Sequence, residues 1–384
     1  RYLLKMYNLY PTKKIFIITL EYPPQIGGIA SYVYNFARHL EPEQTVVYAP
    51  KMKGDKEFDA VNPWKTYRLR PYWAFIWPHW LRLLWQVRKI VKLEKPELIM
   101  VHHALPSGYV AYYLKKTRKI PYQIFLHGTD VEAGTKTKSK TKKLNKICRE
   151  AQKVVVNSEF TKSKLLARLE NLTNVEVFYP CPAEFFFQSA PAEAIKKLKS
   201  QLALEGKKVI LTVARLVEGK GYPHLIRLLP EILNKIPNIV WLVIGDGPKK
   251  KAIMDLVQKY SLQNIVRYLG EVPYQNLPLY YQSADLFVLL THKDEQSEEG
   301  WGTVFLEAGA SGLPVVAGRV GGVEEVVANL QTGLLVDIYQ DAGVISAVVE
   351  LLHNEEYAKK MGAAGRERAQ KEFNWDNQIR KLDL

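Results

Sequence analysis

The chain has 384 residues, of which 47% are hydrophobic and 24% are charged, values that exclude a disordered, collagen-like or coiled-coil protein and predict two domains. Its net charge of +15 is concentrated in one half, because residues 1–190 carry 31 Lys and Arg against 15 Asp and Glu, whereas residues 191–384 carry 23 against 24. This asymmetry predicts that the first half meets a polyanion, either nucleic acid or an anionic membrane, and that the second half does not.

Apolar runs with little polar alternation recur along the chain, and each is followed by a turn and an amphipathic stretch. The first series covers residues 14–20, 46–49, 98–102, 122–126, 153–157 and 175–178. After a polar stretch, a second series covers residues 209–214, 239–245, 266–269, 286–290, 314–317 and 333–336. Such runs are typical of strands buried on both faces of a parallel sheet. We therefore predict an α/β fold of two successive doubly wound parallel-sheet domains.

Features of secretion and of membrane-spanning helices are missing from the sequence. Residues 1–10 lack a signal-peptide core, and no stretch reaches the roughly 18 apolar residues of a spanning helix. Cys148 and Cys181 are too few for a disulfide framework and lack metal-ligand spacing. We expect a cytoplasmic protein that touches a membrane without crossing it, with no structural zinc.

A Gly-Gly turn at Gly27 and Gly28 lies between the first predicted strand and the helix after it. Glycine allows a ligand to approach closely, and a helix N-terminus favours an anion such as pyrophosphate. An ordinary tight turn is the alternative. The sequence has no G-x-G-x-x-G after a strand, no P-loop and no D-x-D, which disfavours NAD enzymes, NTPases and a carboxylate-held metal.

Two pairs of charged residues in the second half are candidates for chemistry. Arg215 and Lys220 follow a predicted strand, at the edge where doubly wound sheets bind ligands, and such cations neutralise a leaving diphosphate without a metal. Glu299 and Glu307 flank a glycine-containing segment, so one carboxylate can reach a sugar and the other a ribose diol. Solvated charges on loops are the alternative for both pairs.

Five motifs spread over nearly the whole chain resemble those of the family-4 retaining glycosyltransferases of GT-B fold. They are G-G-I at 27–29, H-G-T-D at 127–130, N-S at 157–158, A-R-L-x-x-x-K-G at 214–221 and E-G-W-G-x-x-x-x-E-A at 299–308. Within that family the chain looks most like bacterial phosphatidylinositol mannoside mannosyltransferases and exopolysaccharide glycosyltransferases.

The resemblance implies two Rossmann-like domains that face a central cleft. We assign residues 1–185 to an acceptor and membrane domain, 186–365 to a nucleotide-sugar donor domain, and 366–384 to a C-terminal helix that returns to the first domain. The implied catalytic residues are His127, Arg215, Lys220 and Glu299. The implied donor-binding residues are Gly27, Gly28, Gly245, Gly302, Thr303, Val304 and Glu307.

Within this scheme the resemblance assigns individual roles. Arg215 and Lys220 hold the diphosphate, and Glu307 takes the ribose hydroxyls. Glu299 positions the transferred sugar, which His127 contacts near its 6-hydroxyl. A hydrogen-bonded structural histidine is the alternative for His127. The family usually has P-N-G-V-D after the last strand of the first domain, where this chain has Y-P-C-P-A-E at 179–184, so contacts of that Asn-Gly pair do not transfer.

A basic and Trp-rich stretch between residues 64 and 92 contains five of the eight tryptophans. Trp favours the headgroup region of a bilayer, and cations favour anionic lipid. The residues we expect at the membrane or acceptor are Trp73, Trp77, Trp80, Trp85, Lys136, Lys138, Lys140, Lys142 and Lys143. An aromatic helix packed on its own domain is the alternative. The lysine run has no aromatic residue for base stacking, so lipid or a phosphate-bearing acceptor fits better than nucleic acid.

These observations lead us to expect a retaining hexosyltransferase. It moves a hexose from a nucleotide diphosphate sugar to a lipid-linked or glycan acceptor at the cytoplasmic membrane face, without metal or cofactor. GDP-mannose is favoured, while UDP-glucose and UDP-N-acetylglucosamine stay open. The alternatives are a GT-B nucleotide-sugar 2-epimerase, which does not need the Trp-rich basic stretch, and a non-catalytic sugar-nucleotide or lipid-binding partner, which does not need the charged pairs.

Overall fold

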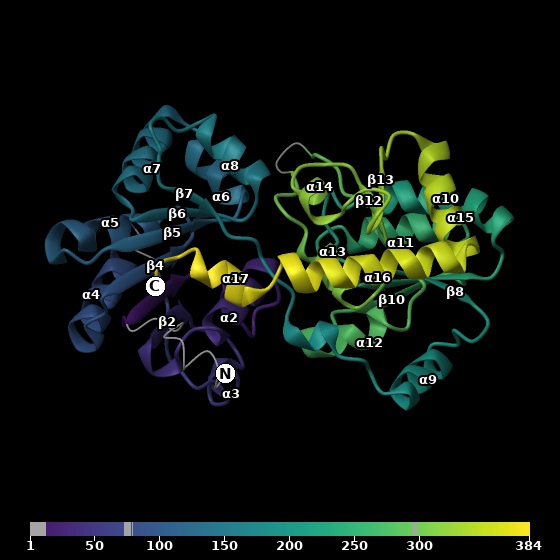
Figure 1. The fold of residues 1–384 in the computed structure, drawn as a ribbon, viewed down its shortest axis with the longest axis horizontal. Coiled ribbons are helices and arrows are strands. Elements are labelled where there is room, and N and C mark those ends of the chain that lie inside the picture. The colour runs from purple at the N-terminus through teal and green to yellow at the C-terminus, as the bar shows by residue number, and fades with distance from the viewer. Residues whose placement is uncertain (1–12, 73–77, 79, 295–297) are drawn as a thin grey trace. The chain divides into compact units, whose positions relative to one another are not determined.

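The computed structural model describes residues 13–72, 78, 80–294 and 298–384, and the chain divides into two compact units (Figure 1). The first unit contains residues 1–180 and 375–384, and the second contains residues 181–374. Among the described residues, none of the helices combines the length and the apolar character that crossing a bilayer requires.

Both unit boundaries differ from those expected at 185 and 366. The segment after Pro180 already belongs to the second unit, where the ring of Phe185 packs 5.3 Å from that of Tyr274. The segment at 366 also stays there, because the helix α16 (Glu355–Glu372) packs along α13 (Thr303–Ala310), and Arg366 Nη1 donates to the Ala310 carbonyl at 3.0 Å.

Seven parallel strands form the sheet of the first unit, in the order β3-β2-β1-β4-β5-β6-β7. Every residue of the three central strands is buried, which explains their continuous apolar character. The strands are β1 (Ile15–Thr19), β2 (Thr45–Pro50), β3 (Lys65–Leu69), β4 (Leu98–His102), β5 (Tyr122–Leu126), β6 (Lys153–Val156) and β7 (Val175–Val177).

Helices cover both faces of this sheet. Phe16 and Ile18 of β1 face one apolar cluster, which includes residues of α4, α5 and α7. On the other face Phe36 of α2 packs against Phe125 and Phe178. The helices of the unit are α2 (Gly28–Arg38), α3 (Asp55–Asp59), α4 (Leu81–Glu94), α5 (Ser107–Arg118), α6 (Thr129–Thr135), α7 (Lys138–Glu150), α8 (Glu159–Leu166) and α17 (Trp375–Arg380), with the 3-10 turn η1 (Pro42–Gln44).

The second unit has a six-stranded parallel sheet in the order β10-β9-β8-β11-β12-β13. Trp241 and Val288 belong to the apolar cluster beneath α10, α11 and α15, whereas Phe287 faces Phe305 of α13 at 5.8 Å. The strands are β8 (Lys208–Val213), β9 (Ile239–Ile244), β10 (Val266–Gly270), β11 (Leu286–Leu289), β12 (Val315–Gly318) and β13 (Gly333–Val336). The remaining helices are α9 (Ala192–Gln201), α10 (Tyr222–Lys235), α11 (Lys250–Lys259), α12 (Leu277–Tyr281), α14 (Val323–Val326) and α15 (Asp341–His353), with the 3-10 turns η2 (Glu184–Phe187) and η3 (Tyr274–Asn276).

Each apolar run of the sequence forms a strand whose ends lie within one residue of the prediction. The structure adds β3, which the sequence analysis did not predict. This strand lies at an edge of the sheet and its side chains are exposed or partly buried. It reads Lys-Thr-Tyr-Arg-Leu, without the continuous apolar character of the central strands, and so resembles a loop.

The C-terminal segment is part of the first unit because its side chains complete that unit's core. Trp375 is 4% exposed, stacks on His39 at 5.2 Å and packs 6.1 Å from Phe178. The backbone N–H of Tyr179 donates to Gln378 Oε1 at 2.9 Å. In Figure 1 the yellow helix α17 accordingly lies among the elements of the first unit.

We predict that Trp375→Ala lowers the free energy of unfolding of the first unit by about 3 to 5 kcal/mol, because it removes a buried indole and leaves a cavity. Denaturant unfolding of the full chain measures this loss. Trp85→Ala is the matched control, since the Trp85 side chain is 51% exposed and its loss should change stability by less than about 1 kcal/mol. Equal effects of the two substitutions would contradict the packing described for Trp375.

Candidate active site

The loop after β8 carries both predicted cations of the second unit. Arg215 is exposed, whereas Lys220 is partly buried and forms an ion pair, with Nζ 2.5 Å from Glu299 Oε2. Lys220 and Glu299 are 79 positions apart in the chain. The structure therefore brings together two residues that the sequence analysis placed on one ligand, and they already compensate each other's charge.

Close backbone packing fixes this loop against the end of β11. Gly221 has a φ of 72°, and a Cβ at that position would lie 2.1 Å from the carbonyl oxygen of Leu290. The His292 N–H donates to the Gly219 carbonyl at 3.0 Å. A side chain at position 221 would both strain the backbone and displace Leu290. The glycine therefore fixes the path of the loop that carries Lys220.

The N-terminus of α13 lies directly after Glu299 in the chain. Gly302 caps the helix with a φ of 88°, and the helix starts at Thr303 and Val304. The first N–H groups of any α-helix have no partner within the helix, and the helix dipole favours an anion there. No acidic residue occupies the first turn of α13. The segment from 302 to 304 therefore offers backbone donors beside the Lys220–Glu299 pair.

Glu307 lies one turn further along α13 and is buried, with 4% of its surface exposed. Its Oε2 accepts a hydrogen bond from the Tyr281 hydroxyl at 3.0 Å, and Tyr274 also hydrogen-bonds the carboxylate. Burial raises the pKa of Glu307 to about 7, although both tyrosines lower it. This carboxylate is thus poised to change charge near neutral pH.

Gly245 completes the group of predicted residues in the second unit. A Cβ at Gly245 would lie 2.1 Å from the carbonyl oxygen of Ala214, which puts the turn after β9 directly against the loop that carries Arg215. Gly27, Gly28 and His127 belong to the first unit, where Gly28 is the first residue of α2. A Cβ added to Gly28 would meet no atom within 4 Å, so this helix N-terminus is open.

His127 follows β5 and is enclosed by aromatic rings. Its ring centroid lies 5.2 Å from Tyr32 and 5.8 Å from His102. Its backbone N–H donates to Asp130 Oδ1 at 2.8 Å, but its Nε2 is buried and has no partner among the described residues. Burial lowers the pKa of His127 to about 3, so the imidazole is neutral at physiological pH.

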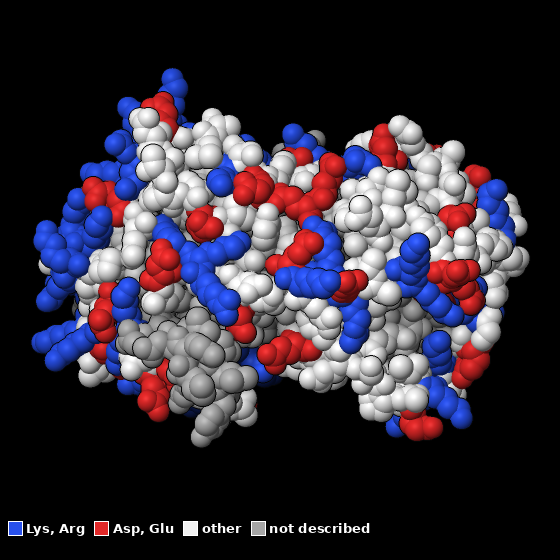
Figure 2. Space-filling model, in the orientation of Figure 1, with Lys and Arg blue, Asp and Glu red and all other residues white. Residues whose placement is uncertain are grey.

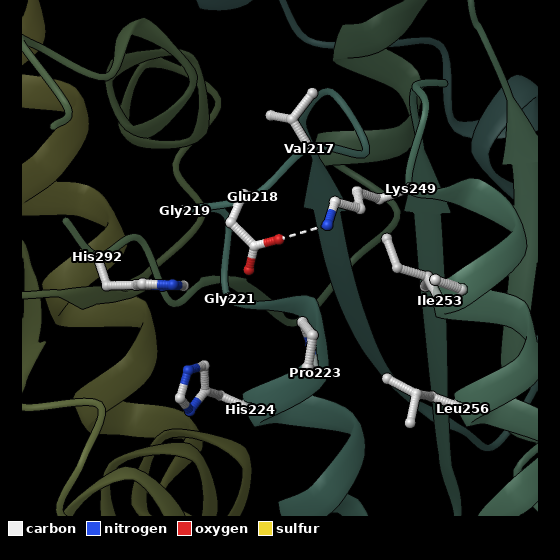
Figure 3. A pocket seen from close by; sticks show the side chains of 11 residues that line it. Val217, Glu218, Gly219, Gly221, Pro223, His224, Lys249, Ile253, Leu256 and His292 are labelled. Carbon is white, nitrogen blue, oxygen red and sulfur yellow. Dashed lines mark ion pairs between the residues drawn. The ribbon is translucent and has the colours of Figure 1, made fainter. Parts of the chain in front are cut away.

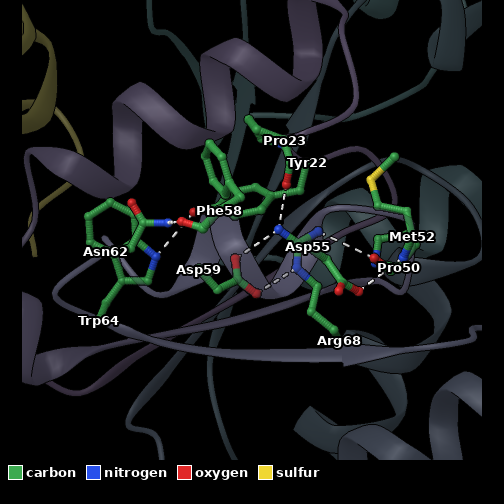
Figure 4. Close-up of polar contacts among 10 residues, drawn as sticks. All are labelled: Tyr22, Pro23, Pro50, Met52, Asp55, Phe58, Asp59, Asn62, Trp64 and Arg68. Atoms are coloured by element: carbon green, nitrogen blue, oxygen red, sulfur yellow. Dashed lines mark hydrogen bonds and ion pairs between the residues drawn. The ribbon is translucent and has the colours of Figure 1, made fainter.

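The loop between β1 and α2 is held by a buried arginine that the sequence analysis had included in the basic membrane stretch. Arg68 contacts both carboxylate oxygens of Asp59 at 2.9 Å and also donates to the carbonyls of Pro23 and Pro50 (Figure 4). The indole N–H of Trp64 donates to the Tyr22 hydroxyl at 3.1 Å. Arg68 and Trp64 therefore brace the turn that leads to Gly28 instead of facing a membrane.

The tryptophans predicted for the membrane do not share one environment. Trp73 and Trp77 lie outside the described residues. Trp80 stacks on Tyr109, with ring centroids 5.5 Å apart, and packs against the core of its own unit, as the alternative interpretation held. Trp85 projects from α4 and is exposed. The predicted cations Lys136, Lys138, Lys140, Lys142 and Lys143 are all exposed.

A pocket of about 170 Å³ opens beside the loop after β8, between α10 and α11 (Figure 3). It is lined by Glu218, which pairs with Lys249 at 2.8 Å, and by His224 and His292, whose rings lie 5.1 Å apart. The lining includes neither Lys220 nor Glu307. The predicted donor-binding residues therefore do not line this pocket.

Sequence reasoning missed Tyr281 and Tyr274, the two hydroxyl groups that hold Glu307. Both precede Glu307 by more than 20 positions, on α12 and η3, and no local spacing links them to it. Only the packing of α12 against α13 brings them together.

Two protein-family models match the chain. Residues 26–181 match the family model described as Glycosyltransferase Family 4, and residues 194–368 match the model described as Glycosyl transferases group 1. The chain belongs to the family-4 glycosyltransferases. The resemblance inferred from the motifs is thereby confirmed.

Two similar glycosyltransferases match nearly the full length of the chain. The GDP-mannose-dependent alpha-(1-6)-phosphatidylinositol monomannoside mannosyltransferase of Mycolicibacterium smegmatis is 28% identical over 362 residues, covering 94% of each protein. The GDP-mannose-dependent monoacylated alpha-(1-6)-phosphatidylinositol monomannoside mannosyltransferase of Corynebacterium glutamicum is 27% identical over 376 residues, covering 95% of each.

Solved structures confirm the GT-B fold of this glycosyltransferase. Anabaena HepE in complex with UDP and glucose matches with a TM-score of 0.81 at 18% identity, over 97% of this chain and 98% of that chain. Sucrose-phosphate synthase from Thermosynechococcus elongatus matches with a TM-score of 0.78 at 22% identity, over 96% of this chain and 97% of that chain.

We predict that Glu307→Gln removes a pH dependence of stability from the second unit. The pKa of Glu307 is about 7 in the folded protein, above the ordinary value of 4.5. The free energy of unfolding of the wild type therefore falls as pH rises from 4.5 through 7. The variant has no carboxyl group at this position and does not show this fall. The difference in free energy of unfolding between wild type and Glu307→Gln should change by on the order of 2 to 3 kcal/mol between pH 5 and pH 8. Denaturant unfolding at both pH values measures it, with the exposed Glu205→Gln as control. A difference that stays constant with pH would refute the prediction.

Proposed function

We propose that this glycosyltransferase moves mannose from GDP-mannose to a lipid-linked acceptor of the phosphatidylinositol mannoside class, with retention of the anomeric configuration. The observation that carries the proposal is the Lys220–Glu299 pair in a chain whose full-length relatives are named for this reaction. GDP-mannose carries its sugar in α linkage and those relatives are named for an alpha-(1-6) product, so their names imply retention.

In this proposal the diphosphate binds at the loop after β8. Arg215 and Lys220 offset the negative charge that grows on the diphosphate as the bond to the sugar breaks, and the N–H groups of Thr303 and Val304 add fixed dipoles. Before the donor binds, Glu299 holds Lys220 at this loop. When phosphate draws Lys220 away, Glu299 is released to accept hydroxyls of the sugar.

Glu307 binds the ribose in the same scheme. Its ionised carboxylate accepts hydrogen bonds from the two ribose hydroxyls, while Tyr281 keeps its orientation. The reaction proceeds on one face of the sugar: the acceptor hydroxyl oxygen bonds to the anomeric carbon, the bond to the diphosphate breaks, and the departing phosphate oxygen takes the hydroxyl proton. The two cations supply the charge that a metal would otherwise provide, so we propose that no metal is required.

We further propose that the first unit binds the anionic inner face of the cell membrane. Lysines and arginines crowd the side of this unit where α5 and α7 lie (Figure 2). Lys138 and Lys140 occupy the first turn of α7, where the helix dipole disfavours cations. Helix stability therefore does not explain their position. Attraction to an anionic membrane surface would, since it contributes about 1 kcal/mol for each cation near the surface.

The outer face of α4 adds apolar side chains to this basic surface. Trp85 is 51% exposed and Leu93 is 66% exposed, and they lie two turns apart on the same face of the helix. Between them Lys89 Nζ lies 3.5 Å from the centroid of the Trp85 ring. An indole flanked by lysine suits the headgroup region of a bilayer.

A panel of sugar nucleotides in excess EDTA tests the proposed reaction. GDP-mannose should raise the melting temperature, since a ligand at 100 times its dissociation constant stabilises by about 2.7 kcal/mol, and mannose should pass to phosphatidylinositol monomannoside. Stabilisation and turnover by a UDP-sugar alone would overturn the donor assignment. Activity that is lost on chelation and restored by magnesium would overturn metal independence. Donor binding without turnover would point to a non-catalytic partner.

We predict that Lys220→Ala and Arg215→Ala each reduce kcat by at least roughly a hundredfold, the scale of losing one group that stabilises charge in the transition state. Steady-state kinetics with GDP-mannose measures the loss. Lys235→Ala removes an exposed cation from the far end of α10 and should leave kcat within twofold. Turnover near the wild-type level in both site variants would show that the diphosphate binds elsewhere.

We also predict that Trp85→Ser combined with Leu93→Ser weakens sedimentation with anionic liposomes while the protein stays folded, because both side chains are exposed. Binding of the wild type should fall as salt rises, since charges are screened beyond about 8 Å at physiological ionic strength. The matched control is Leu330→Ser with Tyr339→Ser, an exposed pair in the second unit. If the wild-type protein does not sediment with anionic liposomes at low salt, the membrane proposal is wrong. The basic surface would then be assigned to a soluble phosphorylated acceptor.

A further inference from the structure

Three polar side chains that follow adjacent strands meet at the carboxyl edge of the first sheet. Glu21 follows β1, His103 follows β4 and His127 follows β5, and these strands are neighbours in the order β1-β4-β5. His103 and His127 lie edge to face with ring centroids 6.3 Å apart. Neither Glu21 nor His103 was among the residues that the sequence analysis singled out.

Glu21 and His103 form a pair whose geometry defines the tautomer of the imidazole. The Leu20 N–H donates to His103 Nδ1 at 3.5 Å, so Nδ1 is the acceptor in this contact. The proton is therefore on Nε2, which faces Glu21 Oε1 at 3.5 Å. The loop itself is tied down by Thr19, whose hydroxyl donates to the Glu21 carbonyl at 2.7 Å. Both contacts of the imidazole are 3.5 Å long and therefore weak, so the Glu21 carboxylate can accept a further hydrogen bond.

The pair is buried on one side and accessible on the other. The His103 side chain is 13% exposed, whereas that of Glu21 is 34% exposed. The second carboxylate oxygen, Oε2, lies 3.7 Å from the point that a Cβ on Gly27 would occupy. The carboxylate therefore reaches solvent beside the open N-terminus of α2.

The surroundings of the pair suit hydroxyl groups better than phosphates. His102 is fully buried and neither of its ring nitrogens has a partner among the described residues; the same is true of His127 Nε2. Burial lowers the pKa of both imidazoles, so they carry no positive charge. Neutral imidazoles do not attract phosphate, and a carboxylate repels phosphate but accepts a hydrogen bond from a hydroxyl group.

We propose that Glu21 binds the attacking hydroxyl of a neutral polyol on the acceptor, and that His103 is the positioning residue that holds the Glu21 carboxylate. This inference rests on the proposed transfer reaction and adds to it the residues that orient the acceptor. The carboxylate accepts a hydrogen bond from the hydroxyl and so directs the oxygen lone pair. Glu21 forms no covalent bond, and the hydroxyl proton still leaves with the departing phosphate oxygen.

Three single variants test this assignment in the full-length protein. Glu21→Gln keeps the shape of the side chain and removes its charge, and His103→Gln removes the imidazole that orients it. Glu43→Gln is the matched control, because Glu43 is exposed and precedes β2, at the opposite edge of the same sheet. The probes are GDP-mannose with phosphatidylinositol monomannoside in vesicles for transfer, GDP-mannose in water for hydrolysis, and GDP alone for binding.

Glu21→Gln should lower kcat/KM for the acceptor at least tenfold and lower the ratio of transfer to hydrolysis by a similar factor, with the dissociation constant of GDP within twofold of the wild type. His103→Gln should act in the same direction and more weakly, mainly on KM for the acceptor. The double variant should be no worse than Glu21→Gln, because His103 acts through Glu21. Glu43→Gln should match the wild type in every measurement.

Each other outcome overturns a different statement. Wild-type kcat/KM in both Glu21→Gln and His103→Gln refutes the assignment and leaves the proposed function intact. Weakened GDP binding in Glu21→Gln also refutes it, because the residue would then serve the donor. If Glu21→Gln does not fold, an unchanged ratio of transfer to hydrolysis in His103→Gln refutes the assignment. No transfer and no hydrolysis by the wild type refutes the proposed function itself.

Discussion

All strands of both sheets run parallel, and this one constraint determines where chemistry is possible. Parallel strands need long crossover connections, so every loop at their carboxyl ends meets its neighbours along one edge. In the second unit this edge brings Lys220, after β8, to Glu299, which precedes α13. In the first unit it brings Glu21 to His103. Both pairs join residues more than 75 positions apart, which helix or strand periodicity alone cannot do.

The two edges differ in charge. The second unit offers cations and backbone donors, which suit a diphosphate, although its overall charge is nearly balanced. The first unit carries the excess positive charge of the chain, yet its sheet edge presents neutral imidazoles and a carboxylate. Its cations lie instead on the outer faces of α5 and α7. The two proposals therefore place membrane binding and hydroxyl binding on different surfaces of the same unit.

The sequence predicted the buried strands well because continuous apolar runs report burial on both faces. It failed at β3, where an edge position relaxes that requirement. The sequence could single out Arg215, Lys220 and Glu299 as candidates because their motifs are local. Tyr281 and His103 were not, because each acts on a partner that only the fold brings near. For a related reason the sequence did not show that Trp80 and Arg68 pack within their own unit: an aromatic or basic composition does not reveal which side chains face the core.

The Lys220–Glu299 ion pair also has a consequence for selectivity among the anions of a cell. An anion that recruits Lys220 separates it from Glu299 and leaves that partly buried carboxylate without its counter-charge. In the proposed donor site, inorganic phosphate satisfies only the lysine, whereas a sugar diphosphate offers a phosphate to Lys220 and a sugar hydroxyl to Glu299. In that proposal the pair selects ligands in which a phosphate and a hydroxyl are covalently linked, and free phosphates compete poorly for the site.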